Sequence, residues 1–251
     1  DVDSDEVGIV GYVVDGAEKT ATVFELNAAR DGFDSATLAD LPGATGKALI
    51  FGVSGDGSRI AGVSKSPGSS SIGEGTTWLR SGPNAPISIG SLSGDKTSSG
   101  RAAWKEGIVG ESGGAVRAIK WDSSAGIQEL PGTDGGLAFA FDVSANGQVI
   151  VGVSSHELFG GAAYYWDDLG IHKLEDPFND QSIALAVSPD GNTIGGWVGE
   201  IDEFDNDYIN AAVWDRISNS VTLLKDAANN RFEGRVLDVS NLGYAVGETR
   251  D

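Results

Sequence analysis

The chain has 251 residues, 40% of them hydrophobic, which is enough for a sizeable core in a single all-β domain. Its 37 acidic and 17 basic residues give a formal net charge of −20, which disfavours nucleic acid and acidic membrane surfaces as partners. Cysteine is absent, which excludes disulfides and thiolate chemistry, and no apolar run approaches the roughly 18 to 20 residues that membrane insertion needs.

A short apolar segment that ends in glycine recurs along the chain. The final glycines of its copies are 51, 48, 42, 44 and 51 residues apart. A period of about 40 to 50 residues is typical of propeller blades or helical arrays. The copies are GIVG at 8–11, RIAG at 59–62, GIVG at 107–110, VIVG at 149–152, TIGG at 193–196 and YAVG at 244–247.

The segments around these copies favour blades over helices. V-S-x-[DN]-G precedes three copies, and its Asp-Gly or Asn-Gly pair is typical of a tight hairpin turn. After most copies comes a segment centred on an aromatic residue and then one that ends in Leu, without sustained helical periodicity. Each unit therefore predicts four short strands, as in a propeller blade. The central aromatic residues are Phe24, Trp78, Trp121, Trp166 and Trp214, and we expect the four Trp side chains to fill the space between blades.

We predict an all-β β-propeller of four-stranded antiparallel blades that forms a single domain over residues 1–251. The first copy lacks an inner strand, and the last has only the two strands RVLDVS and YAVGE. The inner strand Arg235–Ser240 completes the first blade in this prediction and closes the ring, which removes exposed sheet edges. Six blades are the alternative. The five predicted blades cover about 7–46, 47–99, 100–135, 136–180 and 181–232, with a closing segment at 233–251.

The third unit differs from the others. It reads RAAWKEGIVG, without V-S-x-[DN]-G, and its turn is shortened to Lys105-Glu106-Gly107. The sequence therefore predicts a tighter hairpin in this unit.

The pattern V-S-x-[DN]-G-x-x-[IV]-x-G, followed by A-x-x-W-[D] and a Leu-ending strand, resembles the HAF-type extracellular repeat over residues 7–251. The SPDG turn at Ser188–Gly191 and the Trp-Asp pairs are similar to those of TolB-type and WD-type propellers, although the Gly-His partner of WD repeats is absent. The resemblance implies a secreted or surface-attached bacterial protein, and no catalytic residue carries over from it. Because the chain starts at Asp1, we expect that a signal peptide has been removed.

The loops between second and third strands vary most, so we look for function there. One of them, GEIDEFDNDYIN at 199–210, concentrates carboxylates, which are ligands that Ca²⁺ prefers. The loop lacks EF-hand spacing, so a solvated acidic loop is the competing interpretation. The candidate metal ligands are Asp202, Glu203, Asp205 and Asp207, and the sequence indicates no other cofactor.

Catalytic candidates are few. His156 lies in the loop SSHELFGG with Ser154 and Ser155 beside it, but adjacency in sequence does not make a triad. Asp142 and Asp238 occupy equivalent positions on inner strands, where Arg235 is a candidate partner for a buried carboxylate. Separated carboxylates from different blades are the machinery of some glycosidases. A structural hydrogen bond to a turn is the simpler interpretation of both acids.

Three hypotheses follow. The favoured one is a secreted or cell-surface binding or adhesion module whose partner is a glycan or another extracellular macromolecule. The second is a carbohydrate-active hydrolase or lyase with acidic residues at the mouth of the ring. The third is a structural repeat module of a larger surface protein. The oligomeric state is not indicated.

Overall fold

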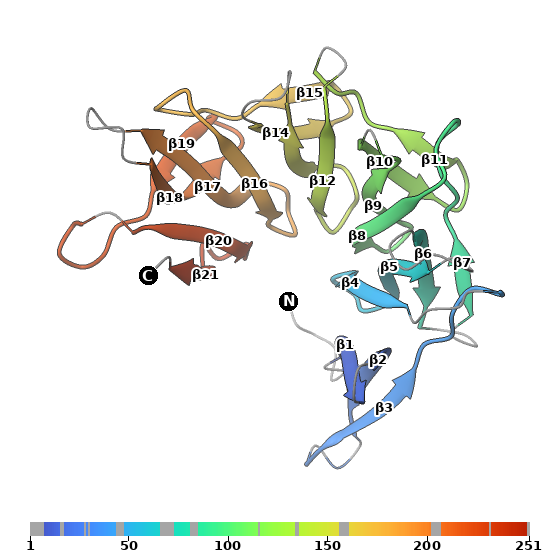
Figure 1. Cartoon of the computed structure of the whole chain (residues 1–251). Coiled ribbons are helices and arrows are strands. Elements are labelled where there is room, and N and C mark those ends of the chain that lie inside the picture. The colour runs from blue at the N-terminus through green and yellow to red at the C-terminus, as the bar shows by residue number, and fades with distance from the viewer. Residues whose placement is uncertain are drawn as a thin grey trace. The chain divides into compact units, whose positions relative to one another are not determined.

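A computed structural model describes residues 8–15, 18–27, 29, 31–43, 48–65, 73–80, 85–114, 116–133, 136–155, 161–201, 207–230 and 232–249, with the backbone alone for 8–20, 26 and 65. All regular structure in these ranges is β-strand, as the sequence predicts (Figure 1). Across the same ranges, no helix has the length and apolar character to span a membrane.

The described strands form one three-stranded sheet, four four-stranded sheets and one two-stranded sheet, in which consecutive strands are hydrogen-bonded neighbours. These sheets fit the predicted count of five blades, with six as the alternative. The first comprises β1 (Gly8–Asp15), β2 (Glu18–Leu26) and β3 (Phe33–Thr37). The next two comprise β4 (Leu49–Val53), β5 (Arg59–Lys65), β6 (Gly73–Leu79) and β7 (Pro86–Ser88), and β8 (Ser98–Trp104), β9 (Gly107–Ser112), β10 (Arg117–Asp122) and β11 (Gly126–Glu129).

The remaining sheets repeat this order. The fourth comprises β12 (Ala138–Val143), β13 (Ile150–Ser154), β14 (Ala162–Asp167) and β15 (Gly170–Lys173), and the fifth comprises β16 (Ser182–Val187), β17 (Thr193–Ile201), β18 (Asp207–Asp215) and β19 (Ser220–Leu223). The last holds β20 (Gly234–Val239) and β21 (Ala245–Thr249), so the two strands predicted for the final copy are confirmed.

The chain divides into two compact units. The first holds residues 1–108, 112–114 and 121–127, and the second holds residues 109–111, 115–120 and 128–251. Closure of a ring by Arg235–Ser240 and the organisation as a single domain are relations between these units, and both stay predictions.

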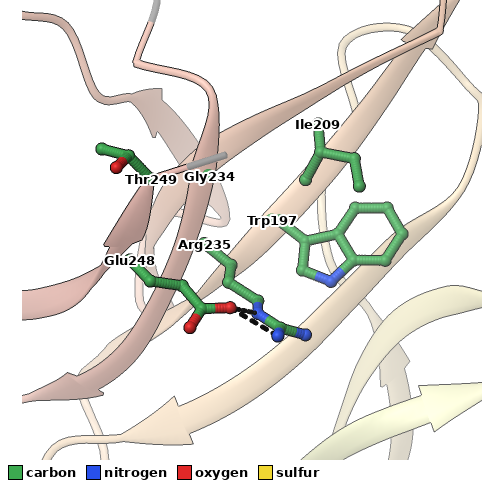
Figure 2. A pocket seen from close by; sticks show the side chains of 6 residues that line it. All are labelled: Trp197, Ile209, Gly234, Arg235, Glu248 and Thr249. Atoms are coloured by element: carbon green, nitrogen blue, oxygen red, sulfur yellow. Dashed lines mark hydrogen bonds and ion pairs between the residues drawn. The ribbon is translucent and has the colours of Figure 1, made fainter. Parts of the chain in front are cut away.

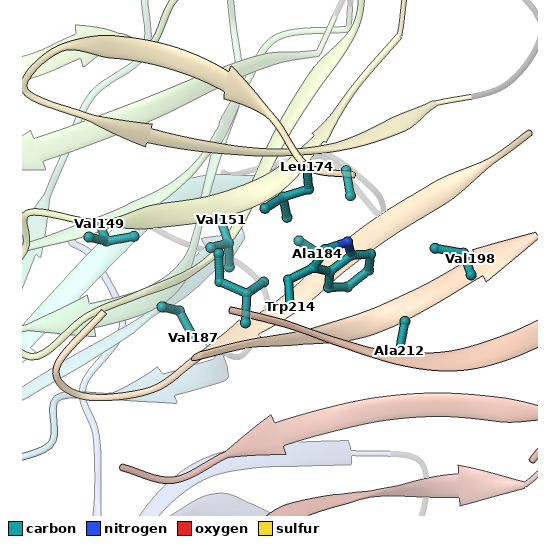
Figure 3. Packing of buried hydrophobic residues seen from close by; sticks show 10 residues of the cluster. Val149, Val151, Leu174, Ala184, Val187, Val198, Ala212 and Trp214 are labelled. Carbon is teal, nitrogen blue, oxygen red and sulfur yellow. The ribbon is translucent and has the colours of Figure 1, made fainter. Parts of the chain in front are cut away.

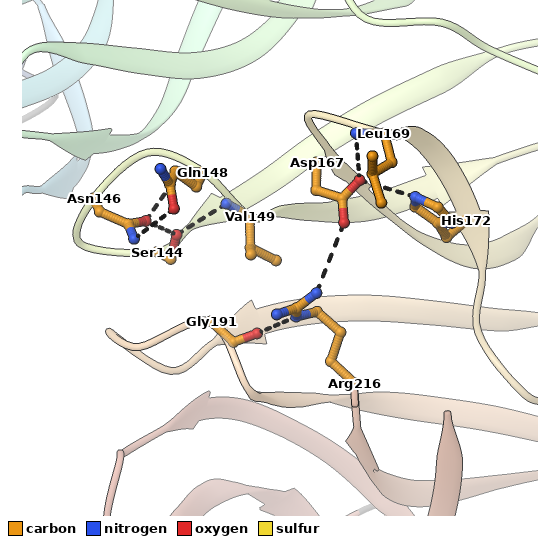
Figure 4. Close-up of polar contacts among 9 residues, drawn as sticks. All are labelled: Ser144, Asn146, Gln148, Val149, Asp167, Leu169, His172, Gly191 and Arg216. Atoms are coloured by element: carbon orange, nitrogen blue, oxygen red, sulfur yellow. Dashed lines mark hydrogen bonds and ion pairs between the residues drawn. The ribbon is translucent and has the colours of Figure 1, made fainter. Parts of the chain in front are cut away.

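The V-S-x-[DN]-G motif builds the turn between the first two strands of a sheet. In the fourth sheet the Ser144 hydroxyl donates to Asn146 Oδ1 at 2.8 Å and accepts from the Val149 N–H at 3.0 Å (Figure 4). Gly147 has φ +72°, a left-handed conformation that a side chain disfavours. The Ser188 hydroxyl and the Asn192 N–H repeat the arrangement and hold the pKa of Asp190 below its usual value. The motif is thus a self-contained hydrogen-bonded turn.

The third sheet lacks this motif, and its first hairpin is tighter, as predicted. β8 ends at Trp104 and β9 begins at Gly107, which leaves Lys105 and Glu106 as the turn. In the fourth sheet, by contrast, β12 ends at Val143 and β13 begins at Ile150.

Inner strands β4, β12, β16 and β20 each contain a β-bulge at the equivalent position. The register shifts between Ile50 and Gly52, Ala140 and Asp142, Ala184 and Ala186, and Val236 and Asp238. A bulge leaves one residue without a ladder partner and redirects the side chains beside it. The unpaired residues are all large and apolar, namely Phe51, Phe141, Leu185 and Leu237.

The tryptophans of the third strands join successive sheets. Trp214 is fully buried with Val149, Val151 and Ala163 of the fourth sheet (Figure 3). Its indole N–H donates to the carbonyl of Glu175, in the linker that follows β15, at 2.7 Å. The same bond recurs from Trp78 to Ala39 and from Trp166 to Pro131. Trp121 is also buried, so the prediction that these tryptophans form the core is confirmed.

Replacing Trp214 tests this packing. We expect Trp214→Ala to lower the free energy of unfolding by about 3 to 5 kcal/mol because it removes the buried ring and leaves a cavity. Trp214→Phe keeps most of the apolar area but leaves the Glu175 carbonyl without its donor, at a cost of about 1 to 3 kcal/mol. Urea denaturation measures both, with Leu169→Ala, at an 82% exposed position, as the control. Equal midpoints for Trp214→Ala and Leu169→Ala would contradict this account of the core.

Candidate functional site

Asp142 and Asp238 follow the bulges of β12 and β20, at the equivalent positions that the sequence indicates. Each carboxylate accepts the N–H of the next residue through Oδ1, from Val143 and Val239 respectively, at 2.8 Å. Asp142 also accepts the Val187 N–H through Oδ2 at 2.8 Å. Val187 belongs to the next inner strand, β16, so Asp142 links two successive sheets.

The reason for this link lies in the sequence of β16. Inner strands are the edges of their sheets, and an edge presents N–H groups that the ladder does not pair. Ala186 takes the place of the aspartate in β16 and offers no acceptor to its own neighbour, Val187. Asp142 on the preceding sheet supplies that acceptor with its second oxygen. Both Asp142 oxygens therefore bind backbone groups, which fits a structural role better than a catalytic one.

The environment of Asp142 changes its acidity. Loss of hydration raises the pKa of its carboxyl group to about 7, although the Val187 and Val143 N–H groups lower it, and the negative charge of Asp238 adds to the rise. The two carboxyl groups thus interact electrostatically.

Arg235 is not the partner of these acids. It lies directly across from Glu248 in the β20–β21 pair, and its Nε donates to Glu248 Oε1 at 2.6 Å. The expectation for Arg235 was wrong because cross-strand register governs its partner, and Asp238 lies beyond the bulge on the same strand.

The other predicted site residues are not brought together. His156, Asp202, Glu203 and Asp205 lie outside the described residues. Asp207 opens β18, opposite Ile201, and is exposed. Among the described residues no group of three or more His, Cys, Asp or Glu could hold a metal ion. The Ca²⁺ loop and catalysis by His156 stay predictions.

The Trp-Asp pair of the fourth sheet has a structural role. Asp167 accepts the Leu169 N–H at 2.9 Å and lies 2.9 Å from His172 Nε2, while Arg216 of the fifth sheet approaches it at 3.7 Å (Figure 4). Arg216 also donates to the Gly191 carbonyl at 2.7 Å. The bond to Leu169 stabilises the turn that follows β14, and the contact with Arg216 links the fourth sheet to the fifth.

A cavity of about 320 Å³, called cavity A below, is the strongest candidate for a binding site, since small-molecule sites typically measure about 300 to 1,000 Å³. In Figure 2 the Trp197 indole lies between Ile209 and the Arg235 guanidinium. β17, β18, β20 and β21 position its lining, which is Trp197, Ile209, Gly234, Arg235, Glu248 and Thr249.

Cavity A combines an apolar side with a polar one. Trp197 and Ile209 form the apolar side, and the ion pair of Arg235 and Glu248 forms the polar side. Both ionic side chains are about half exposed, at 50% and 52%, so they are accessible to a ligand. Gly234 has φ +153°, and a Cβ there would lie 2.1 Å from the Glu248 carbonyl oxygen. A glycine is therefore required at this edge of the cavity.

The sequence pattern does not predict cavity A. Its signal was Trp197 itself, which lies on a second strand rather than at the third-strand position shared by Trp78, Trp166 and Trp214. The equivalent residue of the fourth sheet is Val153. The repeat pattern does not require a Trp at this position, so Trp197 is the residue that distinguishes this part of the fifth sheet from the fourth.

Comparison with known proteins gives the fold. No family model matches the chain, so the HAF-type resemblance is not confirmed, and no curated protein matches it. The propeller domain of the Trilobed protease from Pyrococcus furiosus is 11% identical over 98% of this chain and 75% of its own, with a TM-score of 0.61. A protein assigned as TolB from Agrobacterium tumefaciens is 15% identical over 99% of this chain and 92% of its own, with a TM-score of 0.58.

TolB from Acinetobacter baumannii is 12% identical over 89% of this chain, with a TM-score of 0.57. The match covers 53% of that protein, so this chain spans about half of its length. Together with the repeated four-stranded sheets, these similarities show that the chain is a β-propeller. At such low identity they show the fold alone.

The carboxyl group of Asp142 generates a pH-dependent prediction. Its pKa of about 7 in the folded state exceeds the unfolded value near 3.8, so between these limits the folded state holds the extra proton and stability falls as pH rises. Asp142→Asn removes this titration. We expect the stability of the natural protein relative to the variant to fall by on the order of 2 to 4 kcal/mol from pH 4 to pH 8.

Urea denaturation at a series of pH values measures this difference. Asp190→Asn is the control, since the pKa of Asp190 is lowered and its titration lies at the acidic end of the range. A stability difference between the natural protein and Asp142→Asn that stays constant from pH 4 to pH 8 would contradict the raised pKa.

Proposed function

We propose that this β-propeller is a binding module for a glycan, and that cavity A is its binding site. The observation that carries the proposal is the pairing of the Trp197 indole with the Arg235–Glu248 ion pair in one cavity. A pyranose ring has a face of C–H groups and a rim of hydroxyls. The indole suits that face, and charged donors and acceptors make strong hydrogen bonds with hydroxyls.

The positions of these side chains support binding by a preformed site. All lining residues lie on strands or at a strand end, so little conformational entropy is lost when a ligand binds. The net charge of −20 favours a neutral or weakly charged ligand over a polyanion. The proposed setting is the cell surface or the secreted fraction, in line with the resemblance to extracellular repeats.

The hydrolase alternative has weaker support. Asp142 is the described acid whose pKa is raised into the range of a general acid, yet both of its oxygens accept backbone N–H groups. Protonation of a glycosidic oxygen would require it to give up one of these bonds. Binding without turnover is therefore the function that the geometry supports best.

The test is a glycan array followed by isothermal titration calorimetry on the best neutral glycan. We expect Trp197→Ala to weaken binding at least about tenfold, because truncation of a central aromatic residue typically costs 1 to 2 kcal/mol or more. Arg235→Ala should weaken it by a similar factor. Leu169→Ala, on an exposed turn of the fourth sheet, is the matched control and should bind as the natural protein does. Array binding that Trp197→Ala leaves unchanged would reject cavity A as the site.

A further inference from the structure

A second cavity, called cavity B below, lies between the fourth and fifth sheets and measures about 190 Å³. Its walls are mainly apolar, with Phe139 and Val153 on the fourth sheet and Ile183 on the fifth. Leu137, 44% exposed, extends the apolar wall toward solvent, and Ser155 and Gln181 contribute polar groups. The Phe139 ring is stacked on Phe141 at 5.8 Å, which fixes its orientation.

Cavity B repeats cavity A one sheet earlier. Phe139 pairs with Val153 two residues before the bulged position of β12, and Ile183 pairs with Trp197 at the same place in β16. Arg235 pairs with Glu248 at the equivalent place in β20. The repeat therefore places a cavity at the equivalent position between the fourth and fifth sheets and between the fifth and last sheets. The residues at that position differ, so cavity B has an apolar wall where cavity A has a charged one.

The two cavities are next to each other. Ile183 lines cavity B and Trp197 lines cavity A, and these residues are direct partners in the β16–β17 ladder. Direct partners project from the same face of a sheet, with Cβ atoms about 4.5 to 5.5 Å apart. The two cavities therefore have walls that meet at this one ladder pair.

We propose that cavity B is a second sugar-binding subsite, so that the ligand is a linear neutral oligosaccharide whose neighbouring rings occupy both cavities. This inference rests on the proposed function of cavity A. At about 190 Å³, cavity B lies below the range of about 300 to 1,000 Å³ typical of drug-sized ligands, and its size suits a single ring.

The charges favour a neutral chain. The Arg235 and Glu248 charges compensate each other in cavity A, and the groups that line cavity B are uncharged. An acidic polysaccharide would bring carboxylates to an apolar wall and to a protein of net charge −20, and both contacts are unfavourable. We expect a linear oligosaccharide, because adjacent subsites on successive sheets select consecutive sugar rings of one oligosaccharide.

The experiment measures affinity against chain length. The probes are β-1,4-linked glucose, N-acetylglucosamine and mannose series of one to six units, with polygalacturonate as the acidic comparison, titrated by calorimetry or by NMR for weak binders. For the natural protein we expect affinity to rise at least about tenfold from one unit to six in a series that binds, since the second subsite adds a contact of about 1.4 kcal/mol or more. Polygalacturonate should not bind.

Variants separate the two cavities. Phe139→Ala should remove the rise with length while one-unit binding stays unchanged, which also shows that the variant is folded. Gln181→Ala, at an exposed polar position, should lower the rise severalfold. Trp197→Ala should abolish binding at every length, and Phe33→Ala, at a partly exposed phenylalanine of β3, should change nothing.

Each outcome decides one claim. A rise with length that persists in both Phe139→Ala and Gln181→Ala overturns the second subsite and leaves the proposed function in place. Binding that survives Trp197→Ala overturns cavity A as the site. A natural protein that binds none of the three series overturns the proposed function and this inference with it.

Discussion

The structure depends on one repeated contact, in which a tryptophan of one sheet packs against the preceding sheet and donates its indole N–H to a linker carbonyl. A four-stranded sheet cannot bury its own apolar faces, so it needs a neighbour. The bonds from Trp78, Trp166 and Trp214 measure 2.7 to 2.8 Å, and each attaches a third strand to the linker that follows the preceding sheet. The fourth, fifth and last sheets present equivalent positions at their inner edges, and the side chains at these positions differ from one sheet to the next.

The sequence predicts the turns, the strands and the core. Local chemistry fixes the turns, because Ser144 and Asn146 complete their hydrogen bonds within six residues. The apolar period fixes the strands, and Trp214 identifies the core because a ring of that size requires burial. The tight hairpin at Lys105 and Glu106 follows from the missing motif. These features depend on contacts within one repeat or on a contact that recurs from one repeat to the next. Both kinds of contact leave a regular pattern in the sequence.

Prediction fails where a single residue meets a partner outside the pattern. Asp142 accepts the Val187 N–H because Ala186 offers that N–H no acceptor, and the pairing of Arg235 with Glu248 depends on a register that a bulge alters. Cavity A is formed by strands about 50 residues apart in the chain, and its one visible signal is Trp197 outside the repeat. The pattern that reveals the scaffold therefore carries little information about the site, since the site consists of departures from it.

The central claim is that cavity A binds sugar through Trp197 while the other tryptophans maintain the fold. The most direct test records the indole N–H resonances of the ¹⁵N-labelled protein during titration with a neutral oligosaccharide. The account predicts a saturable shift of the Trp197 resonance, with the resonances of Trp78, Trp166 and Trp214 unchanged because their N–H groups bind linker carbonyls in the core. A saturable titration in which the Trp197 resonance does not move would contradict it.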